Sequence, residues 1–363
     1  MINNDTNLYE YIIKRYDDVD IKSLEIGIPI IKTYHNLAFP MSIICFQDVV
    51  KGWFFSNFIN VYAYYNEEVH DFKINYDVQY YEDEVYYLHR ENIQINTMDK
   101  LSNNIIEKII LLIDSEKYIC LFIDEYYINN TLSTEICHNE HELLIYGYDK
   151  CNKILKCLFY GNDLHLKTRE VTFEEFEKAY YSKFLNRKLP ILCYSYYERN
   201  AWFRPDYSID PKYIKHLLVS YINSINFLYD RRHVNPLNCS QFNSYGINVY
   251  DSLCKYCRRK WELNEEIDLR QLYFIYENKV IMKKRLLYMY KNSLLRSEEC
   301  IHQFENVVKN AKKILNIVIK YNLNRKKYEN DYDRINNIIN QIKEMKKNET
   351  DIINNVINSI VLN

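Results

Sequence analysis

A histidine and an amide that could share a proton-transfer role lie in the stretch HELLIYGYDKCNKILKCLFYGND, which begins at His141. Two apolar runs flank a polar tripeptide, a pattern that predicts a β-hairpin. We place Tyr148 opposite Lys153, which sets His141 opposite Tyr160 and makes Asn162 a diagonal neighbour of the histidine on the same face. A side-chain oxygen beside one ring nitrogen fixes the tautomer of a histidine and leaves the other nitrogen as a general base. The spacing permits this chemistry without requiring it, because a histidine that only starts a strand would look the same.

Zinc binding is the competing chemistry, because cysteines and histidines gather in the same region: Cys137, His138, His141, Cys151 and Cys157. Structural zinc requires four ligands, commonly in closely spaced pairs, and this set lacks that spacing. The separate pair Cys254 and Cys257 lies in a helical, apolar context, where two buried thiols are the simpler interpretation. We therefore expect no metal and no other cofactor.

The elements that must position these side chains follow one another along the first half of the chain. NNIIEKIILLI predicts a helix, and EKYICLFIDEYYI predicts a buried strand whose end carries Asp124 and Tyr127. After the hairpin, Thr172 and Glu175 have the spacing of a capping box ahead of an amphipathic helix. We expect a mixed or antiparallel sheet formed by residues 118–126, 141–149, 153–161 and 190–197.

The pattern changes once, near ERNAWFRPDYSIDP, where prolines and polar residues interrupt it. From there almost every segment has helical period, beginning with Asp210 and Pro211, which suit the N-cap and first position of a helix. Further helices are expected in residues 248–263 and 269–292 and in a long polar-rich segment over 297–360. The sequence thus predicts an α+β domain over residues 1–205 and an all-helical domain over residues 206–363.

Composition argues against several classes of protein. The 363 residues are 48% hydrophobic, which is enough for at least one substantial core. Lys and Arg total 47 against 49 for Asp and Glu, so no global field draws the protein to nucleic acid or to an anionic membrane. We find no secretory signal pattern, no apolar run near the roughly 20 residues of a membrane span, and no regular cysteine spacing. We expect a cytoplasmic protein with reduced thiols.

Several of these segments resemble a known family. The succession FIDEYYINN, HNEHELLIYGYDKCNKILKCLFYG and REVTFEEFEKAY is similar to the papain-like N-terminal domain of the butirosin biosynthesis protein H family, a relative of the cysteine peptidases that process bacteriocin leaders. In such domains a strand ending in Asp-x-Tyr-Tyr precedes a histidine that heads an HxxxxxGYD strand. The helical segments YGINVYDSLCKYC and LYFIYENKVIMKKRLLYMY are similar to the C-terminal half of these proteins. The likeness covers about residues 24–300, and the histidine hairpin is its one compact motif.

The resemblance implies a papain-like fold with a thiol nucleophile at the start of an early helix, a histidine base and a residue that orients the base. His141 fills the base position, and Asn162 can take the orienting role, with Asp163 as a less favourable substitute. The segment TYHNLAFPMSIICFQDVVKGWFFSNF should hold the nucleophile on a helix opened by Pro40. Cys45 is the only cysteine in that segment.

Two departures from the family pattern leave the chemistry open. The family thiol often follows a histidine directly, and Asn36 stands at that position here. Cys45 would lie more than one helical turn deeper, and Ser42 is a further candidate nucleophile. The return strand also lacks the aspartate that peptidases of this type carry near its end.

The activity that the resemblance implies is acyl transfer. The protein that names the family moves an aminoacyl group from a carrier-protein thioester to an amine of an aminoglycoside. We therefore expect a cysteine-dependent acyltransferase or amide-forming enzyme of natural-product biosynthesis, whose partners are an acyl or peptidyl carrier protein and a small-molecule amine. Asp124 and Tyr127 would line its cleft. A catalytically inactive papain-like domain that serves as an accessory or binding protein is the first alternative, and an ordinary cysteine peptidase is the second.

Overall fold

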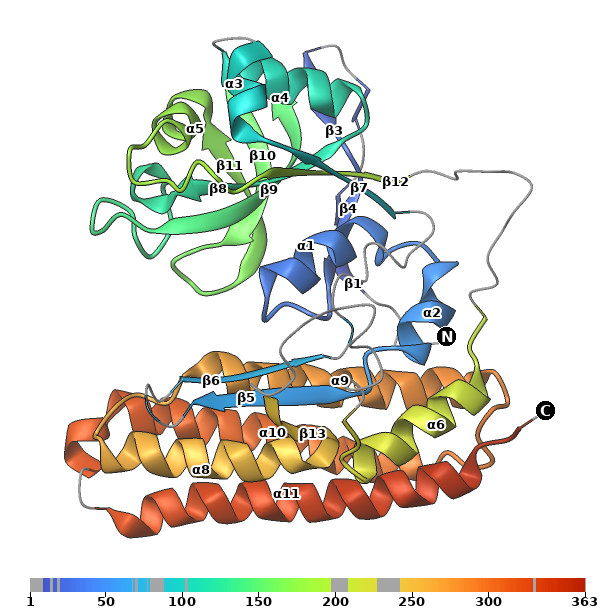
Figure 1. Ribbon diagram of the computed structural model, residues 1–363. Coiled ribbons are helices and arrows are strands. Elements are labelled where there is room, and N and C mark those ends of the chain that lie inside the picture. The colour runs from blue at the N-terminus through green and yellow to red at the C-terminus, as the bar shows by residue number, and fades with distance from the viewer. Residues whose placement is uncertain are drawn as a thin grey trace. The chain divides into compact units, whose positions relative to one another are not determined.

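The chain folds as two compact units (Figure 1). The computed structural model describes residues 9–13, 16–17, 20–66, 68, 71–76, 78, 88–101, 104–196, 208–226, 242–328 and 331–362. Unit 1 comprises residues 1–6, 49–79 and 207–363, and unit 2 comprises residues 7–48 and 80–206. The last change of unit along the chain, between residues 206 and 207, lies beside the expected boundary at residue 205, but residues 49–79 belong with the helical unit. The expected α+β class is confirmed.

Unit 2 is built on an antiparallel sheet with the strand order β11-β10-β9-β8-β12-β7. These strands are β7 (Leu88–Ile93), β8 (Tyr118–Asp124), β9 (Glu140–Asp149), β10 (Ile154–Tyr160), β11 (Leu166–Thr172) and β12 (Ile191–Tyr196). The short strands β2 (Tyr16–Asp17) and β3 (Ile21–Ser23) extend the sheet from β9, and β1 (Tyr9–Ile13) pairs separately with β4 (Ile26–Pro29). The sheet expected from four sequence segments is therefore present.

Helices cover both faces of this sheet. Figure 1 shows α3 (Ile95–Leu101), α4 (Ile105–Asp114) and α5 (Phe173–Tyr180) on one face, and α1 (His35–Ile44) on the other. The capping box at the start of α5 is confirmed: Thr172 Oγ1 accepts the Glu175 N–H at 3.2 Å, and the Glu175 carboxylate accepts the Thr172 N–H at 2.8 Å.

Unit 1 joins a helical bundle to a three-stranded antiparallel sheet. Its helices are α2 (Val50–Ser56), α6 (Pro211–Ile222), α8 (Val249–Glu262), α9 (Leu269–Lys291), α10 (Glu299–Leu323) and α11 (Tyr332–Ser359). Its strands lie in the order β13 (Phe242–Tyr245), β5 (Val61–Asn66) and β6 (Asp71–Tyr76). The expectation of an all-helical domain is therefore wrong, because β13 pairs with a strand from the first quarter of the chain.

Two helices of unit 1, α6 and α11, begin at aspartate residues that cap them. Asp210 accepts the N–H groups of Lys212 and Tyr213 at the start of α6, as expected for an N-cap. Asp331 caps α11 in the same way through the Arg334 N–H. The long segment expected over 297–360 is consequently two helices, α10 and α11, joined through the short 3-10 helix η5 (Arg325–Tyr328).

A fully buried arginine attaches residues 49–79 to the bundle. Arg285 of α9 donates to the carbonyl oxygens of Phe55, Asn57 and Phe58 at 2.7, 2.5 and 3.1 Å. These carbonyls lie at the C-terminal end of α2, where backbone acceptors lack partners within the helix and the helix dipole is negative. Burial lowers the pKa of Arg285 to about 9, so the guanidinium remains charged at neutral pH.

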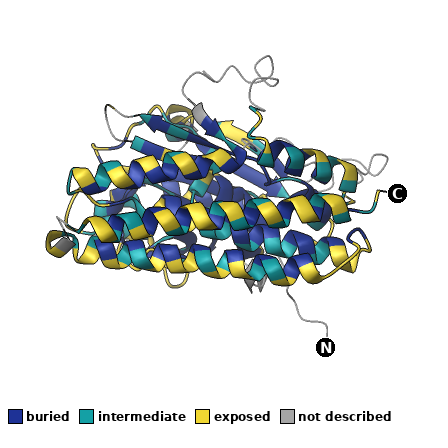
Figure 2. Cartoon of the chain, turned by 90° about the horizontal axis from the view of Figure 1, so that it is seen from below, coloured by how far each residue is buried: buried dark blue, intermediate teal, exposed yellow. Residues whose placement is uncertain are grey.

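The bundle core also holds a buried ion pair. Lys279 of α9 donates to Glu349 of α11 at 2.6 Å, and the hydroxyls of Tyr250 on α8 and Tyr221 on α6 donate to the same carboxylate at 2.6 and 3.1 Å. Each long helix otherwise carries one buried and one exposed face (Figure 2), as expected for an amphipathic bundle. Within the described ranges, no helix combines the length and the apolar character needed to cross a membrane.

Candidate functional site

The histidine hairpin forms in a register that differs from the expected one. Tyr148 pairs with Leu155 instead of Lys153, because the turn between the strands contains the four residues 150–153. A bulge at Tyr146 then shifts the register of β9 against β10, and their pairing ends at Leu144. The predicted pairing of His141 with Tyr160 is wrong, since β10 pairs with β9 only as far as Leu144. On the other side of β9, His141 pairs with Ile123 of β8.

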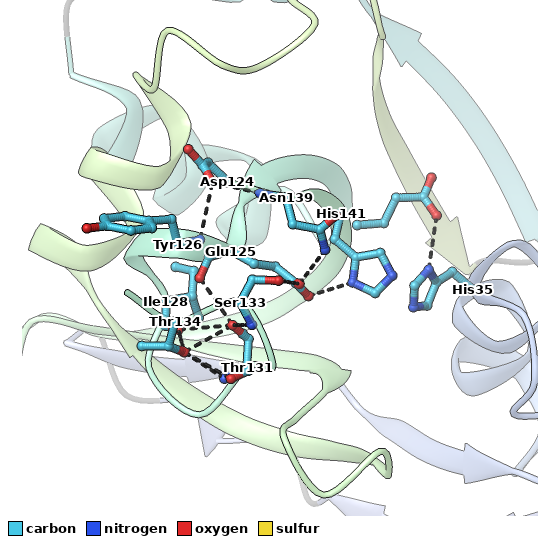
Figure 3. Close-up of polar contacts among 11 residues, drawn as sticks. His35, Asp124, Glu125, Tyr126, Ile128, Thr131, Ser133, Thr134, Asn139 and His141 are labelled. Atoms are coloured by element: carbon cyan, nitrogen blue, oxygen red, sulfur yellow. Dashed lines mark hydrogen bonds and ion pairs between the residues drawn. The ribbon is translucent and has the colours of Figure 1, made fainter. Parts of the chain in front are cut away.

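The partner of His141 is Glu125, which the sequence analysis did not single out. Strand β8 ends at Asp124, and the chain turns into the 3-10 helix η2 (Glu125–Tyr127). This turn and the pairing of β8 with β9 bring Glu125 Oε1 to 2.5 Å from His141 Nδ1 (Figure 3). The sequence does show two adjacent acidic residues, Asp124 and Glu125, at the end of β8. This signal identifies the partner of His141 only once β8 and β9 are known to be neighbours.

Glu125 is held ionised by its surroundings. Its buried carboxylate accepts a hydrogen bond from Asn139 Nδ2 at 2.7 Å and another from Ser133 Oγ at 3.2 Å. Burial alone would raise the pKa of Glu125, but the hydrogen bond and charge of His141, together with these two donors, lower it below its usual range. An ionised carboxylate only accepts, so His141 Nδ1 carries the proton and Nε2 is left as the basic nitrogen.

His35 is the second imidazole of the site. It is the first residue of α1, and its ring lies edge-on to that of His141 with 4.2 Å between centroids. The same ring contacts Tyr160 at 4.7 Å and stacks on Phe39 at 5.1 Å. Burial and the charge of His141 lower the pKa of His35 to about 3, which keeps this imidazole neutral at physiological pH.

The structure does not bring Cys45 to His141. The helix that Pro40 was expected to open begins at His35, Pro40 lies inside it, and Cys45 caps its C-terminal end. Ten residues of helix span about 15 Å, so the thiol lies at the opposite end of α1 from the residue that contacts His141. Burial raises the pKa of Cys45, and the negative end of the helix dipole also disfavours a thiolate. The expected role of Cys45 as nucleophile is therefore not supported.

Ser42, the other candidate nucleophile, and Asn36, which stands where the resemblance would place the thiol, have no described contact with His141. Ser42 is buried and donates its hydroxyl to the Phe39 carbonyl at 2.7 Å. Asn36 is exposed at the second position of α1. His35 is therefore the residue at the start of α1 that contacts the ring of His141.

Asn162 does not orient His141. Its backbone N–H donates to the Asn130 carbonyl at 2.7 Å, its side chain is exposed, and none of its described contacts reaches the histidine. Asp163 binds Lys167 and Arg169 at 2.6 and 2.7 Å. The hydrogen bond from Lys167, reinforced by Arg169, lowers the pKa of Asp163 to about 2. The orienting role expected for Asn162 is therefore held by Glu125.

Asp124 supports the neighbouring loops instead of lining a cleft. It is buried and accepts hydrogen bonds from Ser182 Oγ at 2.5 Å and His138 Nδ1 at 2.7 Å. Burial would raise its pKa, but these donors lower the pKa of Asp124 overall. The His138 ring stacks on Phe184 at 3.7 Å. Tyr127 is half-buried with its ring near His138 at 6.0 Å, so both expected lining residues belong to this second histidine–carboxylate pair.

The residues considered for zinc remain apart. Across the part of the chain that the structure describes, no three or more His, Cys, Asp or Glu residues are grouped so that they could hold a metal ion. Cys137 and Cys151 are exposed, whereas Cys157 is buried. Cys254 and Cys257 are buried thiols in α8, in keeping with the interpretation of that pair.

Comparison with known proteins does not assign this site. No protein-family model matches the sequence, and no curated protein matches it. The interpretation of the site therefore depends on its geometry and on the residues that carry the resemblance described above.

Proposed function

We propose that unit 2 is a papain-like acyl-transfer domain that works without a protein thiol. In this proposal His141 is the general base and Glu125 is the carboxylate that orients it. One observation carries the proposal: a carboxylate that is 7% exposed holds Nδ1 of an imidazole that is 34% exposed. The buried partner fixes the tautomer, and the accessible ring leaves Nε2 available to a substrate. The resemblance supports an acyl thioester on a carrier protein as the donor and a small-molecule amine as the acceptor.

In the proposed reaction the acceptor amine attacks the thioester carbonyl directly. His141 Nε2 takes a proton from the attacking nitrogen as the C–N bond forms, and returns it to sulfur as the C–S bond breaks. The products are an amide and the free thiol of the carrier. Glu125 stabilises the intermediate imidazolium, and binding both reactants in one site supplies the proximity that a covalent intermediate would otherwise provide.

Direct transfer can be tested with a small thioester. The full chain is incubated with the butyryl thioester of N-acetylcysteamine and benzylamine, and both the amide and the intact protein mass are measured. We expect amide without a butyrylated protein, a rate about 10² to 10⁴ lower in His141→Ala, and an unchanged rate in Cys45→Ala. His138→Gln is the matched control, because it alters the other histidine–carboxylate pair. A butyryl group on Cys45 would overturn the proposal.

A binding role without catalysis is the second candidate function. The placement of Cys45 favours it, because a buried thiol at the far end of α1 cannot supply the covalent step that the family uses. In that case wild type and His141→Ala would both form no amide above the background rate. Protection of the amides of residues 123–125 and 141 from hydrogen exchange by the butyryl thioester would then identify the same site as a binding site.

A further inference from the structure

His35 has a position that suits the binding of negative charge. It opens a helix of 10 residues whose first turn contains no acidic residue, and its N-cap residue, Tyr34, provides no side-chain hydrogen bond to the helix. The helix dipole places partial positive charge there. The carboxylate oxygen Oε2 of Glu142 lies 3.7 Å from His35 Nδ1, within the range of an ion pair. That separation exceeds hydrogen-bond range, so among the described contacts the imidazole makes no hydrogen bond.

The two imidazoles of the site differ in their hydrogen-bond partners and in their exposure. His141 donates its Nδ1–H to an ionised carboxylate, which fixes its tautomer and the orientation of its ring. His35 is 16% exposed and packs against Phe39 and Tyr160, which favours the neutral ring. A neutral imidazole still has one N–H to donate, and it can do so over the whole pH range in which His141 serves as a base.

We infer that His35 is a further catalytic residue of the proposed acyl transfer, donating a hydrogen bond to the oxyanion that forms on the thioester carbonyl. The inference rests on the proposed function. When the amine adds, the C–N bond forms and the carbonyl electron pair moves onto oxygen; His35 stabilises that oxygen without transferring a proton. The pair returns to carbon as the C–S bond breaks. Because the rings of His35 and His141 are 4.2 Å apart, one reacting carbonyl can contact both.

Two substitutions separate hydrogen-bond donation from packing. His35→Phe keeps a ring against Phe39 and Tyr160 but removes the donor, whereas His35→Gln keeps an N–H donor. With the butyryl thioester and benzylamine, we expect kcat to fall about 10²- to 10³-fold in His35→Phe with KM changed less than threefold. His35→Gln should retain kcat within about tenfold of wild type. Circular dichroism and thermal unfolding of both variants serve as the test that each one folds.

A binding measurement distinguishes failure of this inference from failure of the proposed function. Butylphosphonate carries a tetrahedral oxyanion, and its binding can be followed by nitrogen-15 NMR of the histidine rings. We expect at least tenfold weaker binding in His35→Phe, and little change in His35→Gln or in the His138→Gln control. Wild type without amide formation would refute the proposed reaction alone. A kcat for His35→Phe within threefold of wild type, or phosphonate binding that is absent or unaffected by this substitution, would overturn the role of His35.

Discussion

Unit 1 and unit 2 each hold a carboxylate against a nitrogen base, and the two pairs differ in how much water reaches the base. In unit 1 the side chains of Glu349 and Lys279 are 0% and 1% exposed. In unit 2 the side chain of Glu125 is 7% exposed, but that of His141 is 34% exposed. Burial lowers the pKa of Lys279 against the opposing effect of Glu349, whereas the accessible ring of His141 can exchange protons with a bound substrate.

This difference separates a structural use of charge from a chemical one. Removing two charges from water costs free energy that only good geometry and further hydrogen bonds offset. The ion pair of unit 1 meets that condition through Tyr221 and Tyr250, and its four members come from α6, α8, α9 and α11. We infer that this ion pair specifies the packing of these four helices against one another. The pair in unit 2 leaves one nitrogen accessible, as a catalytic base requires.

The largest expected effect is on the stability of unit 1. Glu349→Ala leaves the Lys279 ammonium buried without a partner, which should cost about 3–5 kcal/mol of unfolding free energy. Urea unfolding followed by the fluorescence of Trp53 and Trp261 measures it, in a Trp202→Phe background that keeps both reporters in unit 1. The double variant Lys279→Met with Glu349→Leu should recover most of the loss. If Glu349→Ala were as stable as wild type, the buried ion pair would not have the structural role assigned to it here.

A smaller loss is expected when the buried arginine is replaced. Arg285→Met leaves the carbonyls of Phe55, Asn57 and Phe58 without their donor and should cost about 1–3 kcal/mol in the same fluorescence assay. Arg259→Met is the control, since Arg259 is 42% exposed and pairs with Glu262 on the surface of α8. Equal losses in the two variants would show that burial does not set the contribution of the arginine.

In unit 2 the expected effect depends on pH. The pKa of His35 is lowered to about 3, so between that value and about 6.5 the unfolded chain binds a proton that the folded protein does not. Stability contributed by the neutral ring is present above pH 6.5 and falls as the pH is lowered. From pH 7 to 5 the loss should be about 1–2 kcal/mol.

Hydrogen exchange of the β8 and β9 amides, corrected for intrinsic rates, measures this loss locally. His35→Gln should have a shallower pH dependence than wild type, because glutamine does not titrate. Parallel pH dependences in the two proteins would mean that His35 is not held neutral.

The smallest effect is expected for a pair that is open to water. Lys178 and Glu174 lie one turn apart on the surface of α5, with side chains 57% and 78% exposed. Solvent screens such a pair, so Lys178→Ala should leave hydrogen exchange in unit 2 unchanged within error. A marked increase in exchange would show that an ion pair open to water contributes to the stability of unit 2, contrary to the expectation from solvent screening.

Local signals in the sequence predicted the structure well. The capping box of Thr172 and Glu175 and the N-cap at Asp210 depend on residues within three positions, and both form as expected. The strands around His141 also lie where their apolar runs predict. The α+β class and most helices therefore followed from periodicity and caps.

Which residues meet in the site depends on strand pairings that no local sequence pattern specifies. The contact of Glu125 with His141 requires β8 beside β9, and the bulge at Tyr146 displaces the register from which Asn162 was chosen. Pro40 suggests a helix start, but α1 begins five residues earlier, at His35. The predicted partner of Tyr148 is two residues from the observed one, and the predicted helix start is five residues from the observed one, so each error displaced an element whose type was predicted correctly.

The attachment of α2 by Arg285 also has a consequence for the order of events on the ribosome. Asn57 and the arginine that binds its carbonyl are 228 residues apart, so at roughly 5–20 residues per second the helix waits about 10 to 50 seconds for its partner. During that interval Phe54 and Phe55 have no bundle to pack against, while the chain of unit 2 is still being completed. The nascent protein therefore exposes an apolar segment early, and we expect this segment to be where a chaperone would bind.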